Sequence, residues 1–163
     1  MRAATRGPHI LYFFKLKEIF KVMLKKTITY VDYNGIERKE DFLFNLTKTE
    51  LMKWDLKTPG GLAAKLEKIS QQFDIPSLTS FIEDLIDKSY GIKSDDGVRF
   101  IKDEKLSTMF RQTEAYDQLF VELLSNEKKT ADFINGILPK ELMEEVKKQN
   151  ATANRPTLLS DNN

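Results

Sequence analysis

The chain has no cysteine and only one histidine, His9, among its 163 residues. Without cysteine it has no disulfide scaffold, no thiolate zinc site and no cysteine nucleophile. A hydroxyl nucleophile usually needs a histidine as its base, and His9 lies in an N-terminal stretch outside the regular patterns described below. These absences argue against most hydrolase classes. We therefore expect neither catalytic activity, nor a metal site, nor a cofactor.

Glycine-rich and acidic ligand loops are also missing. Gly60-Gly61 lacks the lysine that follows the glycines of a phosphate-binding loop, so it is better interpreted as a break between helices. The acidic stretch Ser94-Asp95-Asp96-Gly97 invites a calcium-site interpretation. With Gly97 at the sixth position of an EF-hand loop, however, Ile92 would stand where the first carboxylate is required. A plain turn is the better interpretation.

No apolar run is long enough to span a bilayer. The net charge of +1 hides an asymmetry, because residues 1–26 hold seven of the 26 Lys and Arg but one of the 25 acidic residues. The remainder is mildly acidic, which argues against a nucleic-acid footprint there.

We divide the chain into a basic leader (1–22), a single globular domain (23–148) and a polar tail (149–163) that we expect to be disordered. The leader is interpreted either as an upstream extension before Met23 or as a basic amphipathic helix for a membrane surface or partner.

The first pattern after the leader predicts a β-hairpin. Residues 27–33 are rich in β-branched and aromatic side chains, and Asn34-Gly35 follows them as a strong turn signal. The returning segment, residues 36–46, begins with charged residues and ends with the alternating Phe42, Phe44 and Leu46. We therefore expect only its far end to meet the core and the turn to project into solvent.

The rest of the globular part predicts short amphipathic helices. Thr47 and Glu50 form a capping box before the first, and residues 62–73 and 81–90 carry the next two apolar stripes, the latter stopped by Gly91. After a second, smaller hairpin at 94–101, three more stripes follow at 106–110, 116–124 and 133–138. Such short helices are stable only when packed together. The fold class is thus predominantly helical α+β, an N-terminal β-hairpin followed by a helix bundle.

Candidate binding residues are few. Most of the eleven Phe and five Tyr residues occur at helix-core spacing, which favours packing over base stacking. Trp54 lies near Met52 on a very short helix, so it is either a core residue, the simpler interpretation, or part of a binding surface. The stripe containing Met109 and Phe110 offers a second surface for a partner helix.

The order of several segments resembles one family, the tail assembly chaperones of long-tailed phages that infect Gram-positive bacteria. No single segment is specific, and their joint order carries the resemblance. The segments are YVDYNG (30–35), DFLFNLTK (41–48), DLIDKSYG (84–91), SDDG (94–97), RFIK (99–102), QTEAY (112–116) and FINGILP (133–139).

The resemblance implies a non-enzymatic protein that binds the aggregation-prone tape measure protein in the host cytoplasm until the tail tube polymerises around it. Relatives often have a longer, frameshifted form that recruits the tail tube protein, and this chain is interpreted as the short form, absent from the mature virion. Whether it forms a homo-oligomer stays open. On this reading it binds neither nucleic acid nor membrane.

A second hypothesis is a small adaptor that binds a membrane surface or nucleic acid through its basic leader. Deleting residues 1–22 separates the two hypotheses. An adaptor would lose salt-dependent binding to anionic lipid or DNA, whereas a tape measure chaperone would keep its client.

Overall fold

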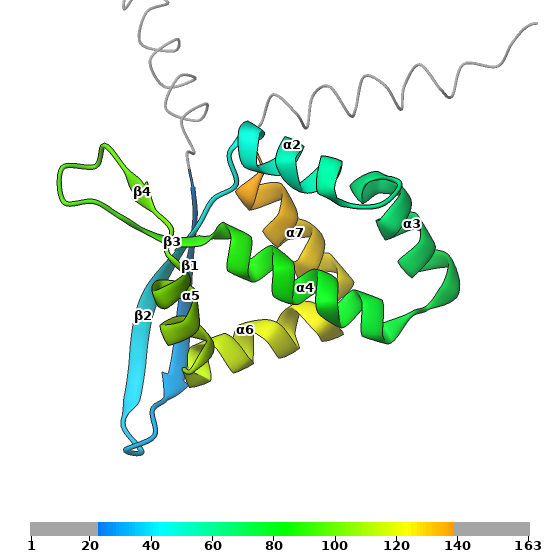
Figure 1. Cartoon of the computed structure of the whole chain (residues 1–163). Coiled ribbons are helices and arrows are strands. Elements are labelled where there is room, and N and C mark those ends of the chain that lie inside the picture. Colours follow the sequence, from blue (N-terminus) through cyan, green and yellow to red (C-terminus); the bar gives the residue numbers. More distant parts are fainter. Residues whose placement is uncertain (1–22, 139–163) are drawn as a thin grey trace, which may run out of the picture.

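A computed structural model describes residues 23–138 (Figure 1). The predicted leader and polar tail lie outside these residues. The fold is a predominantly helical α+β arrangement, which confirms the predicted class. Its elements in chain order are β1 (Leu24–Val31), β2 (Glu37–Phe44), α2 (Lys48–Lys57), α3 (Gly61–Gln72), α4 (Ile75–Ser89), β3 (Tyr90–Lys93), β4 (Phe100–Ile101), α5 (Glu104–Arg111), α6 (Glu114–Ser125) and α7 (Glu127–Ile137).

The hairpin predicted at Asn34-Gly35 is present. Strands β1 and β2 pair antiparallel up to Val31 opposite Glu37, and Gly35 adopts a left-handed conformation with φ of 78°. One carboxylate oxygen of Asp32 accepts from the backbone N–H groups of Asn34 and Ile36, at 2.9 and 3.0 Å. The first five residues of β2 are exposed, the next two are half-buried and Phe44 is buried, so the far end meets the core as the sequence pattern predicted. The turn extends beyond the helices (Figure 1).

We expect the substitution Gly35→Val to lower the free energy of unfolding by about 1–2 kcal/mol, the cost of a left-handed conformation for a side chain with a Cβ. A Cβ at Gly35 would have no atom within 4 Å, so steric contact adds nothing to this backbone cost. Urea unfolding measures the change. Gly35→Asn is the control and should cost less, because asparagine tolerates positive φ. Equal losses in both variants would contradict the argument.

The second hairpin is also present, but its environment differs from the prediction. Gly91 does not stop a helix, because α4 ends at Ser89 and Gly91 is the second residue of strand β3. A Cβ at Gly91 would lie 2.6 Å from the carbonyl oxygen of Ile101 and 2.5 Å from the ring of Phe100. Glycine is therefore required here by close approach of β4. Strand β3 pairs with both β2 and β4, which joins the two hairpins into one antiparallel sheet of order β1-β2-β3-β4.

Local capping interactions set the starts of α2 and α4. At α2, the Thr47 hydroxyl accepts from the Glu50 backbone N–H at 3.2 Å, and the Glu50 carboxylate accepts from the Thr47 backbone N–H at 2.9 Å. The Asp74 side chain caps α4 by accepting from the Ser77 backbone N–H. The cap at Thr47 and Glu50 agrees with the sequence prediction, and both caps satisfy backbone groups that a helix start leaves unpaired.

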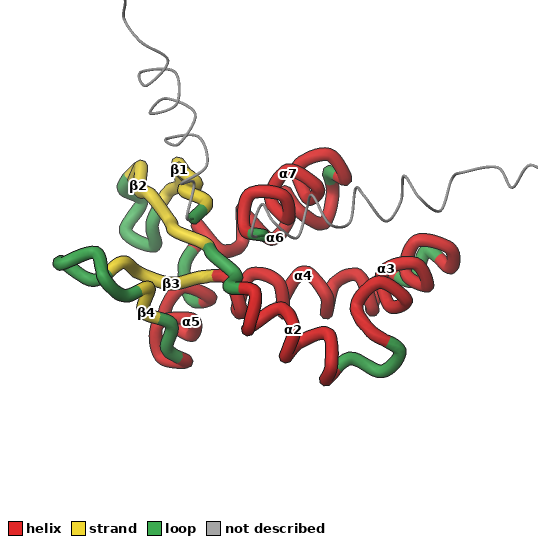
Figure 2. Tube along the Cα trace, turned by 90° about the horizontal axis from the view of Figure 1, so that it is seen from above, coloured by secondary structure: helices red, strands yellow, loops and turns green. Residues whose placement is uncertain are grey.

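The core lies between the sheet and the helices α4, α6 and α7. Phe44 and Ile82 are fully buried, and the ring of Phe44 meets that of Phe133 edge-on, with centroids 5.0 Å apart. Seen from above, α4 lies between the α6–α7 pair and α2 (Figure 2). Helix α4 buries five side chains, whereas α2 buries only Trp54 and α3 only Ile69. We call residues 48–73, which are α2, α3 and the C-terminal cap Phe73, the α2–α3 arm; each of its two helices is anchored by a single buried side chain.

Candidate partner-binding groove

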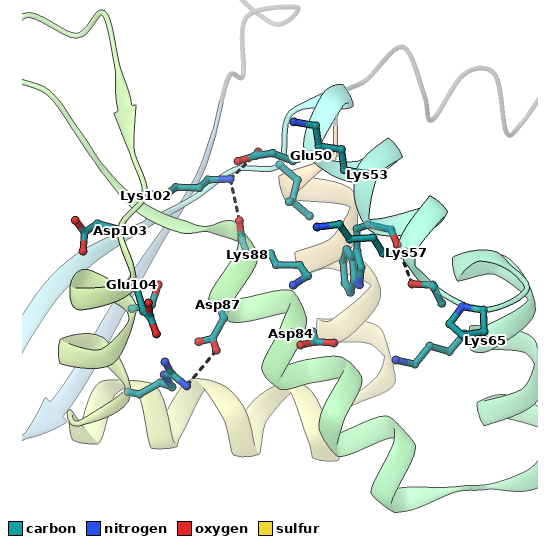
Figure 3. A pocket seen from close by; sticks show the side chains of 16 residues that line it. Glu50, Lys53, Lys57, Lys65, Asp84, Asp87, Lys88, Lys102, Asp103 and Glu104 are labelled. Atoms are coloured by element: carbon teal, nitrogen blue, oxygen red, sulfur yellow. Dashed lines mark hydrogen bonds and ion pairs between the residues drawn. The ribbon is translucent and has the colours of Figure 1, made fainter.

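An open groove of about 780 Å³ separates α2 from α4 and α5 (Figure 3). Its walls are mostly charged. The basic side chains are those of Lys53, Lys57, Lys65, Lys88, Lys102 and Arg111, and the acidic ones are those of Glu50, Asp84, Asp87, Asp103 and Glu104. Because the two signs are nearly balanced, the groove does not suit a polyanion such as nucleic acid.

Trp54 supplies an aromatic surface to this groove. The indole is 8% exposed and stacks on the ring of Phe81, with centroids 5.6 Å apart and planes at 14°. The ammonium group of Lys88 lies 5.5 Å from the centroid of the indole, a cation–π contact. Trp54 thus fixes α2 to α4 and also lines the groove. The burial agrees with the core interpretation, and a contact between Trp54 and a partner stays a prediction.

Lys102 joins three segments of the chain at the end of the groove. Its ammonium group donates to the Glu50 carboxylate at 2.7 Å and to the backbone carbonyl of Lys88 at 2.8 Å (Figure 3). It also donates to the backbone carbonyl of Asn45 at 2.6 Å. An ammonium group has three donors, so all of them are used. The contact to Lys88 also places a positive charge at the C-terminal end of α4, where a cation is favourable. Lys102 therefore holds the start of α2 against the end of α4.

The ionisation of this pair follows from its partial burial. Burial alone would raise the pKa of Glu50, but the hydrogen bonds from Lys102 and Thr47 hold that pKa below its usual value. Burial lowers the pKa of Lys102, and the hydrogen bond to Glu50 opposes this effect. Both groups are charged at neutral pH and form an ion pair with each other.

Asp87 and Arg111 form a looser pair in the groove wall, with a carboxylate oxygen and a guanidinium nitrogen 3.4 Å apart. Burial raises the pKa of Asp87, although Arg111 opposes the shift. Burial, together with the charges of Asp87 and Glu83, raises the pKa of the nearby Tyr116 hydroxyl to about 12. These shifts follow from packing at the base of α5.

The outer side of the α2–α3 arm is apolar and exposed. Met52 is 54% exposed and Leu56, one turn further along α2, is 82% exposed. At the far end of α3, Phe73 is 84% exposed and adopts a left-handed conformation with φ of 48°. We call Met52 and Leu56 the α2 ridge. Helical spacing places this ridge opposite Trp54 and next to Lys53 and Lys57 of the groove wall.

The four candidate binding residues do not form one surface. Trp54 lines the groove, and Met52 lies on the opposite side of the same helix. Met109 is 56% exposed on α5, whereas Phe110 is buried at 3%, with its ring 4.3 Å from that of Tyr90. Sequence reasoning did not single out Leu56 or Lys102. The spacing of Leu56 four residues after Met52 was a usable signal, whereas the partners of Lys102 are distant in sequence.

No group of three or more His, Asp or Glu side chains that could hold a metal ion is found within residues 23–138. In the same part of the chain, none of the helices combines the length and the apolar character needed to cross a membrane.

A protein-family model described as phage tail assembly chaperone matches residues 23–163. The chain belongs to this family. The match includes every described strand and helix, so the sheet, the α2–α3 arm and the groove are features of a tail assembly chaperone. No curated protein and no solved structure matches the chain. This match confirms the resemblance to tail assembly chaperones that the order of the sequence segments indicated.

Proposed function

We propose that this tail assembly chaperone binds the tape measure protein and keeps it soluble during tail tube assembly, in the host cytoplasm and without catalysing a reaction. One observation carries the proposal. The α2–α3 arm buries one side chain per helix yet exposes Met52, Leu56 and Phe73. A protein that holds an apolar client needs such a surface, together with enough charge to stay soluble when it is empty.

The groove and the α2 ridge suggest how the client is held. Tape measure segments that are amphipathic helices can lay their apolar face on Met52 and Leu56. Acidic residues on the flank of such a helix then meet Lys53 and Lys57, which line the neighbouring groove. The apolar contact supplies most of the affinity, because hydrophobic association scales with the area removed from water.

Coexpression tests this function. We expect the full chain to keep the tape measure protein of the same phage genome soluble and to elute with it at both low and high salt, since salt screens charges but not apolar contacts. Addition of nucleotide should change nothing, because the sequence has no phosphate-binding loop. Equal precipitation of the tape measure protein with and without the chaperone would overturn the proposal.

A further inference from the structure

Strand β1 forms one edge of the sheet, and no strand within residues 23–138 pairs with its outer side. The hydrogen bond from the Asp32 N–H to the Ile36 carbonyl, 2.9 Å long, shows which backbone groups face inward. In an antiparallel pair these groups alternate, so the N–H and C=O groups of Thr27, Thr29 and Val31 face outward. The bond from the Asn45 N–H to the Ser89 carbonyl on the far side of β2 gives the same alternation.

Helix α6 runs beside this open edge. Near the start of β1, Lys26 forms an ion pair with Glu122 of α6. Near the hairpin turn, the Glu114 carboxylate at the start of α6 raises the pKa of the Tyr33 hydroxyl, through a hydrogen bond and through its negative charge. The helix is therefore antiparallel to the strand and follows its length.

A groove of about 520 Å³ lies between the strand edge and the helix. We call it the β1–α6 slot. On the β1 side it is lined by residues that include Thr27 and Thr29, and on the α6 side by residues that include Asp117, Gln118 and Val121. The strand edge offers hydrogen-bonding groups that no other described strand pairs with, and the helix surface forms a floor beneath them. This is the geometry in which an extended peptide adds to a sheet.

The two open edges of the first hairpin differ in composition. Residues 37–41 of β2, beyond the short pairing with β3, are all charged, and charge is a common protection against unwanted strand pairing. Residues 27–31 of β1 are Thr, Ile, Thr, Tyr and Val, with no charge, glycine or proline. The sequence thus protects one edge and leaves the other suited to pairing.

We propose that the β1–α6 slot binds an extended segment of a partner protein, which joins the sheet as a further strand antiparallel to β1. The occupant carries small apolar side chains at alternate positions, because Val121 in the floor is 53% exposed. It carries a basic residue near its N-terminal end, since the antiparallel direction places that end beside Glu114 and Asp117.

A second copy of the chain fits the slot less well than a single strand. Two β1 strands paired antiparallel are related by a two-fold axis perpendicular to the sheet, so both α6 helices would lie on the same face. In each copy, α6 already fills the space beneath the position of an added strand. The α6 helices of the two copies would therefore compete for the same space. The slot shares no lining residue with the groove beside α2, so this inference goes beyond the proposed function and stands or fails separately.

The test uses the full chain and a fluorescein-labelled synthetic peptide with an N-terminal arginine followed by alternating valine and threonine. We expect saturable binding by fluorescence anisotropy. In hydrogen exchange followed by NMR, the amides of Thr27, Thr29 and Val31 should become protected when the peptide binds, because these are the donors that face the slot.

Two variants with matched controls complete the test. Thr29→Pro removes an outward donor without removing a bond to β2, and should weaken peptide binding about tenfold, the effect of one backbone hydrogen bond. Lys39→Pro changes the residue paired with Thr29 on β2 and should leave affinity within about twofold. Val121→Asp should also weaken binding, whereas Val98→Asp on the β3–β4 hairpin should not.

Three outcomes would overturn the proposal. The first is unchanged affinity in folded Thr29→Pro and Val121→Asp variants. The second is amide protection in the peptide-free chain that increases with protein concentration, which assigns the edge to a second copy. The third is protection that is complete without peptide at every concentration, which assigns the edge to another part of the same chain.

Discussion

Replacing Lys102 with methionine is expected to lower the free energy of unfolding by about 2–4 kcal/mol, because the loss leaves partly buried acceptors without a donor. The acceptors are the carbonyls of Asn45 and Lys88 and the carboxylate of Glu50. Methionine keeps most of the apolar stem, so the change isolates the ammonium group. Urea unfolding followed by circular dichroism measures the difference.

Lys93→Met is the matched control, because Lys93 is an exposed lysine on β3. This variant should stay within about 0.5 kcal/mol of the unsubstituted chain. Hydrogen exchange should locate the effect of Lys102→Met, with faster exchange in α2 than in α6, since the ammonium group holds the start of α2. A Lys102→Met variant as stable as the control would show that solvent satisfies the three acceptors.

The Glu50–Lys102 pair is also expected to make the free energy of unfolding depend on pH in the acid range. Because the pKa of Glu50 is lower in the folded chain than its ordinary value of 4.5, its contribution to stability is present above that pH. The contribution is lost as the pH falls from 4.5 through the lowered pKa. The Lys102→Met variant lacks the largest of the interactions that lower this pKa and should lose less stability over this interval, which a series of urea titrations measures.

The parts of the fold that were predictable from the sequence are those set by neighbouring residues. Asn34-Gly35 encodes the first turn, and Thr47 with Glu50 encodes the start of α2, because the hydrogen bonds and backbone angles involved lie within a few positions. The apolar stripes of α5, α6 and α7 were likewise visible, since helical periodicity is a local property.

Distant contacts account for what the sequence did not show. Gly91 resembles a helix stop, and only the pairing of β3 with β2 and β4 shows that a strand passes there. Helical periodicity places Phe110 on the apolar face of α5, but it does not predict that the rings of Tyr90 and Tyr116 pack against it. For the candidate site, the sequence placed Met52 and Trp54 on one helix, while their opposite orientations depend on where α4 lies.

Substitutions in the α2 ridge are expected to weaken binding of the client strongly. The double substitution Met52→Asp with Leu56→Asp is expected to weaken tape measure binding by about 100-fold or more, because each buried apolar side chain contributes about 1.5–3 kcal/mol. Both residues are exposed in the free chain, at 54% and 82%, so the fold should be retained. Co-purification after coexpression, with circular dichroism of the isolated variant, measures both effects.

Two further variants separate a client surface from a structural one. Val98→Asp introduces the same charge at a site that is 80% exposed on the β3–β4 hairpin, and it should leave the complex intact. Trp54→Asp should unfold or loosen the α2–α3 arm before any client is added, because the indole is stacked on Phe81. If the double variant is folded and still binds the client at high salt, the tape measure protein contacts another surface and the ridge is not its binding site.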